Sequence, residues 1–181
     1  RALARDDEPA DLAFLQLRPM TAHRDEVDVD VLPDADRSTL LCASNLALGH
    51  GGLRNLQDVV YVVPARFDRS HTAEVAAEVA QVNDGLRRTG TGYVLVGPGR
   101  WGTGDRWLGI PVQWGQISGA RAIVETELQA LPVTPSEGAH FFQNMISAGV
   151  RYLHVVAGDP ESFFDHGWLD AQPAVHDGKY V

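Results

Sequence analysis

The stretch that decides the fold is VVYVVPARFDRSHTAEVAAEVAQVNDGLRRTGTGYVLV, residues 59–96. It begins with a β-branched apolar run, residues 59–63, which Pro64 ends, and it finishes with a second apolar run, residues 93–96. Between them, apolar residues recur at helical spacing over Thr72–Arg88, with acidic residues early and arginines late, as the helix dipole favours. This pattern predicts a strand–helix–strand unit with two parallel strands and a right-handed crossover.

The rest of the chain predicts further elements of the same kind. We expect strands at residues 39–43, 120–125 and 152–157, and a second helix at residues 135–147 that ends before Gly149. Two weaker strands are predicted at residues 11–18 and 28–31. The expected fold is therefore α/β, with a central, largely parallel sheet and flanking helices. A chain of 181 residues with 44% hydrophobic content buries one core, so we expect a single domain.

Composition limits the classes of function. Fifteen Lys and Arg against 24 Asp and Glu give a formal charge of -9, which argues against nucleic acid as a partner. A single cysteine, Cys42, forms no internal disulfide and fits a reducing cytoplasm. No apolar stretch approaches the ~18 residues of a membrane helix, so we expect no membrane association. The chain starts at Arg1 rather than Met, and we expect it to be part of a longer protein.

A glycine-rich loop, residues 97–106 (GPGRWGTGDR), follows the predicted strand at 93–96. Ligands of α/β proteins bind at the carboxyl ends of parallel strands, where free backbone N–H groups and guanidinium groups favour an anion. The sequence thus predicts a phosphate or carboxylate site at Gly97, Gly99, Arg100, Gly102 and Arg106. The alternative is a structural loop that packs over the sheet edge, since neither GxxxxGK[ST] nor GxGxxG is matched.

Four further residues are candidates for the same site, each with an alternative role. Ser44 and Asn45 follow a predicted strand and either line the cleft or form a local turn. His140 lies near the predicted start of the second helix and either contacts an anion or packs beside phenylalanines. Gln143, one turn on, donates its amide either to a ligand or to the glycine loop.

Other chemistries find no support in the residue inventory. The seven histidines show neither HxxxH nor HxH spacing, so we expect no metal site within the domain. No GxSxG motif indicates a serine hydrolase, and Cys42 within an apolar run is more typical of core than of a nucleophile.

Three segments carry a resemblance to a known family: residues 95–125, residues 135–155 and SNLALGHGG at 44–52. They resemble the C-terminal region of large bacterial proteins related to phosphoenolpyruvate synthase and pyruvate phosphate dikinase, and the resemblance covers most of the chain. LQLRP at residues 15–19 is similar to the closing strand of the ATP-grasp domain that precedes this region in the family. The resemblance implies that Gln16 belongs to a metal–phosphate site and Arg18 to a nucleotide pocket, with ATP and Mg²⁺ as cofactors of the parent protein.

The resemblance also implies a domain boundary. Residues 1–20 would be the tail of an ATP-grasp-type domain, and residues 21–181 a C-terminal α/β domain whose partner is that upstream domain. The chain lacks an ATP-grasp body and a TSHAA-type phosphohistidine motif, so it cannot catalyse the full dikinase reaction alone. Two hypotheses follow. Either the domain lines an anion-binding cleft of an ATP-dependent phosphotransferase, or it is a non-catalytic module for assembly or regulation of the parent.

Overall fold

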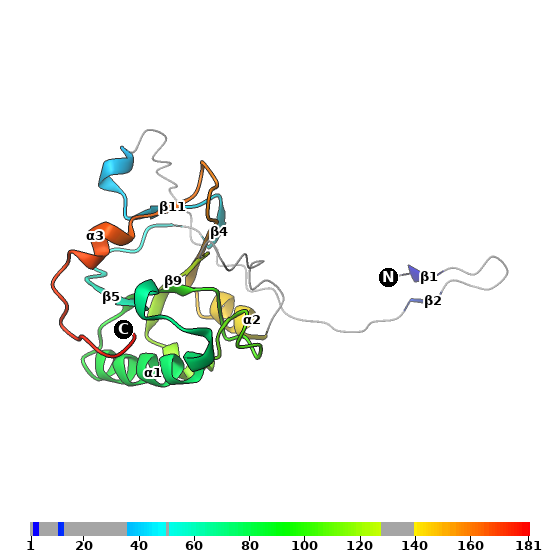
Figure 1. The fold of residues 1–181 in the computed structure, drawn as a ribbon. Helices are drawn as coiled ribbons and strands as arrows, with labels where there is room; N and C mark the ends of the chain where they lie inside the picture. Colours follow the sequence, from blue (N-terminus) through cyan, green and yellow to red (C-terminus); the bar gives the residue numbers. More distant parts are fainter. Residues whose placement is uncertain (1, 4–10, 13–35, 50, 128–139) are drawn as a thin grey trace.

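A five-stranded, mostly parallel sheet forms the centre of the molecule in the computed structural model, which describes residues 2–3, 11–12, 36–49, 51–127 and 140–181 (Figure 1). Its strands follow the order β4-β10-β9-β6-β5. They comprise β4 (Leu46–Leu48), β5 (Asp58–Tyr61), β6 (Tyr93–Pro98), β9 (Ala120–Thr126) and β10 (Arg151–Val155). Only β4 is antiparallel to its neighbour, so the predicted α/β class with a largely parallel sheet is confirmed.

The predicted strand–helix–strand unit with two parallel strands is confirmed. Helix α1 (Thr72–Arg88) has the bounds that the sequence predicts, and β5 and β6 are parallel neighbours, with Val60 opposite Leu95. Val75 and Val79 of α1 are fully buried, while Val82 and Leu86 pack against the same core. Gly90 follows the helix with φ +74°, a conformation that glycine adopts without strain. Local periodicity therefore sets this half of the sheet.

Both faces of the sheet are covered. Side chains of α1 and α2 (His140–Ser147) join Tyr93, Leu95 and Ile123 in the main core. On the opposite face, a smaller cluster of Val96, Val124 and Val155 packs against Phe164 of β11 (Phe163–Phe164). Figure 1 shows α1 and α2 on one side of the sheet, and β11 with α3 (His166–Asp170) on the other. Side chains alternate between the two faces along a strand, so residues two apart, such as Tyr93 and Leu95, face the helices together.

The predicted strand at residues 39–43 needs correction. Asp36 accepts a hydrogen bond from the Ser38 backbone N–H and caps a 3₁₀ turn, η1 (Arg37–Thr39). Within this span only Cys42–Ala43 forms a strand, β3, and it pairs with β11 outside the main sheet. Strand β4 was not predicted, because three exposed residues give no alternating pattern that periodicity can detect.

The remaining predicted elements either differ from the observed ones only at their ends or lie outside the described residues. Strands β9 and β10 match the segments predicted at 120–125 and 152–157 to within two residues, and Gly149, with φ +68°, follows α2. The described part of the second helix begins at His140, so residues 135–139 of its predicted span lie outside the description. The predicted strand at 28–31 lies there as well.

Near the N-terminus, β1 (Ala2–Leu3) pairs antiparallel with β2 (Asp11–Leu12). Of the strand predicted at residues 11–18, only these two residues are described, and they belong to a separate two-stranded sheet. Neither is part of the central sheet.

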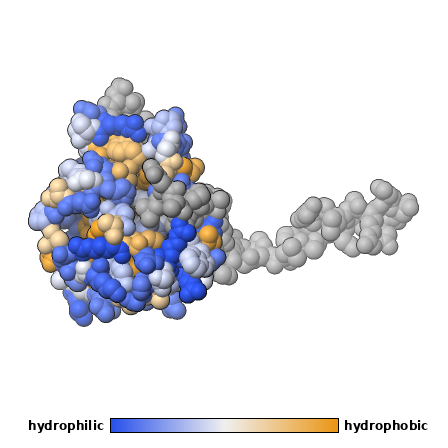
Figure 2. Space-filling model, in the orientation of Figure 1, coloured by the Kyte–Doolittle hydropathy of each residue, from blue (hydrophilic) through white to orange (hydrophobic). Residues whose placement is uncertain are grey.

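The face of the described chain that is drawn in Figure 2 is mainly polar. Hydrophilic residues cover most of the face drawn in Figure 2, and smaller apolar patches interrupt them. Within the described ranges, none of the helices has both the length and the apolar character needed to cross a membrane.

Candidate functional site

The glycine loop leaves β6 at the carboxyl edge of the sheet, where sequence analysis places the anion site. Its first part forms β7 (Arg100–Trp101), which pairs with β8 (Gly109–Ile110). Gly99 has φ +72°, and a Cβ there would lie 2.6 Å from the Leu108 carbonyl oxygen. Glycine is therefore required at position 99 by both backbone conformation and space.

Two more glycines of the loop are in contact with aromatic side chains. The indole of Trp101, which is buried, packs on Gly97, and the ring of Phe141 packs on Gly102, which has φ +74°. Helix α2 and the glycine loop therefore meet, as the alternative roles of Gln143 require. Gly97, Gly99 and Gly102 are each explained by a contact within the protein, which is what the structural-loop alternative predicts.

Arg106 lies at a cavity of about 460 Å³ between the end of the glycine loop and the start of α1. Its guanidinium carbon is 5.6 Å from the ring centroid of the exposed Trp107. The cavity is lined by Ser70, Thr72, Ala73, Gly104, Asp105, Arg106, Trp107 and Pro111. The first N–H groups of a helix have no intrahelical acceptor and carry partial positive charge. An arginine facing a helix start makes this cavity a candidate for binding an anion.

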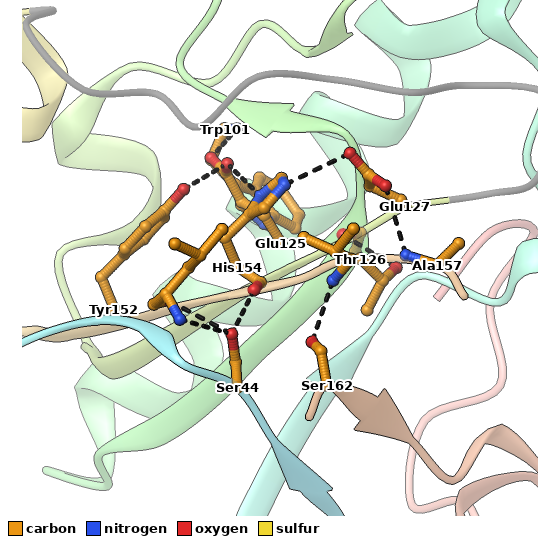
Figure 3. A network of polar contacts seen from close by, with 12 residues as sticks. Ser44, Trp101, Glu125, Thr126, Glu127, Tyr152, His154, Ala157 and Ser162 are labelled. Atoms are coloured by element: carbon orange, nitrogen blue, oxygen red, sulfur yellow. Dashed lines mark hydrogen bonds and ion pairs between the residues drawn. The ribbon is translucent and has the colours of Figure 1, made fainter. Parts of the chain in front are cut away.

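A buried ionic cluster lies at the same edge of the sheet (Figure 3). His154 of β10 is in register with Glu125 on the adjacent parallel β9, and both side chains are 1% exposed. Its Nδ1 is 3.5 Å from Glu125 Oε2, and its Nε2 is 3.4 Å from Glu127 Oε1. Neither ring nitrogen has a well-aligned hydrogen-bond acceptor among the described residues, so the imidazole interacts with the two carboxylates as an ion pair.

Hydrogen bonds hold both carboxylates in place. Glu125 Oε1 accepts from the Trp101 backbone N–H at 3.0 Å, and Glu125 Oε2 accepts from the Tyr152 hydroxyl at 2.6 Å. Glu127, 12% exposed, accepts from the Ala157 backbone N–H at 3.2 Å. The cluster thus connects β9, β10 and the glycine loop through a single carboxylate, Glu125.

The protonated form of His154 is favoured in this setting. Burial alone lowers the pKa of the imidazole, but Glu125 and Glu127 together outweigh it and raise the pKa above its usual value of 6.5. The imidazolium supplies one positive charge to the buried carboxylate of Glu125 and the partly exposed carboxylate of Glu127.

The four additional candidate residues have separate surroundings. Ser44 accepts a hydrogen bond from the Leu46 backbone N–H at 2.9 Å, which is the local turn considered above, and donates to the carbonyl oxygen of His154. Asn45 donates to Glu161 Oε2 at 3.2 Å. Gln143 is half-buried on α2, where its backbone carbonyl oxygen accepts a hydrogen bond from the Ser147 hydroxyl. The side chain of His140 lies outside the described residues, as do Gln16 and Arg18.

The described contacts therefore bring Ser44 beside the buried cluster and place Arg106 at the cavity, but do not assemble all candidates around one cleft. Arg100 is half-buried at the start of β7 and has interaction partners of its own. The described ranges contain no group of three or more His, Cys, Asp or Glu side chains arranged to hold a metal ion.

Glu125, Glu127 and His154 are functional candidates that the sequence patterns above do not predict. The sequence does contain a usable signal. Ionisable residues seldom lie within apolar strand patterns unless they are paired, and such residues occur in both ARAIVETE (120–127) and RYLHVV (151–156). Their pairing depends on the order and register of β9 and β10, which are not visible in either segment alone.

In comparisons with protein-family models, curated proteins and solved structures, nothing matched this chain.

Proposed function

We propose that this chain is the C-terminal α/β domain of an ATP-dependent phosphotransferase similar to phosphoenolpyruvate synthase and pyruvate phosphate dikinase. In this proposal residues 21–181 form a single domain that binds a small phosphate or carboxylate anion, and residues 1–20 close an upstream ATP-grasp-type domain. ATP and Mg²⁺ bind to that upstream domain, and the protein is cytoplasmic. The isolated chain binds ligand without turnover.

The observation that carries the proposal is the cavity at Arg106. It combines a guanidinium group, the first turn of a 17-residue helix and the exposed aromatic ring of Trp107 in one concave surface. Helix N–H groups and a guanidinium both donate hydrogen bonds to an oxyanion, and neither can accept one. The cavity is also built from the segment that carries the family resemblance, residues 97–111.

Asp105 provides a second test of the proposal, because its negative charge opposes the binding of an anion in the cavity. It lines the same cavity, and its Oδ1 accepts a hydrogen bond from the Trp107 backbone N–H at 2.9 Å. An amide oxygen in its place keeps this hydrogen bond but removes the negative charge. Asp105→Asn should therefore strengthen anion binding, whereas Arg106→Ala should weaken it.

The experiment is calorimetric titration of phosphate, phosphoenolpyruvate, pyruvate, ATP and AMP into the chain and its variants. We expect one of the anions to bind, and Arg106→Ala to weaken it by about tenfold, the lower end for a hydrogen bond to a charged group. Arg88→Ala, at the opposite end of α1, removes the same charge from an exposed position and should change affinity little. If none of these compounds binds, or if Arg106→Ala and Arg88→Ala behave alike, the cavity is not an anion site.

The second candidate function, a non-catalytic assembly module, is favoured by the edge strand β4. Its two leucines, Leu46 and Leu48, are 40% and 37% exposed, and β4 forms one edge of the sheet. Exposed apolar side chains on an edge strand favour contact with another protein surface, here the upstream domain of the same polypeptide. Leu46→Lys with Leu48→Lys should weaken association of the separately prepared upstream domain with this chain, and leave anion binding unchanged.

A further inference from the structure

We propose that the Glu125–His154–Glu127 cluster is a proton-controlled latch on the glycine loop, residues 97–106. With His154 protonated, the latch is closed and Glu125 holds the backbone of Trp101. With His154 neutral, Glu125 releases Trp101 and the loop loosens. This function concerns the position of the loop and does not depend on anion binding there.

Geometry is the first support for the latch. Glu127 directly follows β9, two residues after Glu125, and its backbone N–H still donates to the Val155 carbonyl oxygen, so both side chains leave the same side of the chain. The imidazole of His154 lies between them, within 3.5 Å of one carboxylate and 3.4 Å of the other. Neither contact is a well-aligned hydrogen bond, so charge rather than directional bonding holds the cluster together.

The consequence of losing the proton follows from burial. Glu125 and His154 are almost fully buried, and a buried charge is tolerated when it is paired. A neutral imidazole would leave the two neighbouring carboxylates without their shared cation. The repulsion is relieved when one carboxylate turns away, and Glu125 is the one that carries the loop.

A backbone hydrogen bond links the cluster to the loop. The Trp101 backbone N–H donates to Glu125 Oε1 at 3.0 Å, and the indole of Trp101 packs on Gly97 at the start of the loop. Trp101 therefore fixes the loop at two points, of which Glu125 controls one. Figure 3 shows Trp101, Glu125, Glu127, Tyr152 and His154 gathered around this junction.

Other titratable groups near the imidazole are few among the described residues. Tyr152, two residues earlier on β10, donates its hydroxyl to Glu125, and on β3, which contacts β10, burial raises the pKa of the Cys42 thiol. Arg100 precedes Trp101 directly and is the loop cation nearest to Trp101 in sequence. Glu125 and Glu127 are the carboxylates that contact His154 directly.

The test is nuclear magnetic resonance of the ¹⁵N-labelled chain between about pH 5.5 and pH 9, a range that spans the ordinary histidine pKa. The Trp101 backbone amide and the His154 ring should titrate with one midpoint, above 6.5, and protection of the Trp101 amide from hydrogen exchange should fall above it. His154→Gln should abolish the Trp101 transition. Glu127→Gln should lower its midpoint by about one unit, because one of the two neighbouring carboxylates is lost.

His176→Gln is the matched control, since His176 also faces a glutamate, Glu78, at 3.8 Å but is exposed and far from the loop in sequence. It should leave the Trp101 transition unchanged. The latch is overturned if Trp101 shows no transition while His154 titrates, or if His154 does not titrate over this range. Both results can be read from the wild-type chain alone, so they remain decisive even if His154→Gln fails to fold.

Discussion

The ring of Phe141, in the first turn of α2, lies directly against the Cα of Gly102 in the glycine loop, in the space where any other residue would place its Cβ. The backbone of Gly102 also has φ +74°. Two independent restrictions thus meet at one residue, and together they fix the glycine loop against a helix that follows it by about 40 residues in sequence.

Gly102→Ala should therefore destabilise the fold. The positive φ alone costs a non-glycine residue about 1–2 kcal/mol, and overpacking adds roughly 1–3 kcal/mol. We expect the free energy of unfolding to fall by about 2–5 kcal/mol, measured by urea denaturation. Gly104→Ala is the control, because Gly104 is exposed, lacks a positive φ and has no neighbouring atom within 4 Å of the point where the alanine Cβ would lie. It should change stability by less than about 0.5 kcal/mol.

Asn83 offers a second prediction, because one buried amide oxygen serves two donors. Asn83 Oδ1 accepts from the Tyr93 hydroxyl at 3.0 Å and from the Gly119 backbone N–H at 3.0 Å, linking α1 to β6 and to the start of β9. Asn83→Ala leaves both donors buried without this acceptor, so we expect a loss of about 2–4 kcal/mol in unfolding free energy. Tyr93→Phe removes only one of the two bonds.

Asn144→Ala, on the exposed face of α2, is the control for that loss. It should be nearly neutral in the same denaturation assay. Equal effects of Asn83→Ala and Asn144→Ala would show that the shared oxygen contributes little.

Stability should also depend on pH through His154. Its pKa is raised above 6.5 in the folded chain, so the folded state binds a proton more tightly than the unfolded state. The stabilising contribution is therefore complete below about pH 6.5 and is lost as the pH rises through the higher folded pKa. The free energy of unfolding, measured from about pH 6 to about pH 9, should fall in the wild type and fall less in His154→Gln. A steeper fall in the variant would contradict the assigned direction.

The fold was predictable where the determining pattern is local. The valines of α1 and the apolar runs on either side of it specify one strand–helix–strand unit within 38 consecutive residues, 59–96. Strand β4 illustrates the opposite case. Its three residues acquire extended structure by pairing with β10, with Leu46 opposite His154, and that partner lies more than 100 residues further along the chain.

The candidate site, like the fold, was predictable only where the determining pattern is local. Arg106 was identified because a glycine loop after a strand is a local motif, and the structure gives it a cavity. Glu125 and His154 form a pair only because β9 and β10 are neighbours in a fixed register, a non-local fact. The glycines of the loop show a third case. Their spacing alone does not distinguish a backbone that approaches a ligand from one that makes room for Trp101 and Phe141.

Arg100 and Arg106 provide the last prediction, since the sequence assigns both to one anion site. Arg106 lines the cavity, whereas Arg100 is half-buried in β7, where its backbone N–H donates to the Leu108 carbonyl oxygen at 2.9 Å. If the glycine loop itself cradles the anion, Arg100→Ala should weaken binding by about 1.5–3 kcal/mol, the range for a hydrogen bond to a charged group. If the anion occupies the cavity, Arg106→Ala should weaken binding more than Arg100→Ala does. We expect the second result, because Gly97, Gly99 and Gly102 are already in contact with protein atoms.

Calorimetric titration of phosphate and phosphoenolpyruvate into both variants decides between the two positions, with circular dichroism to confirm folding. A larger effect of Arg100→Ala would place the anion site in the loop.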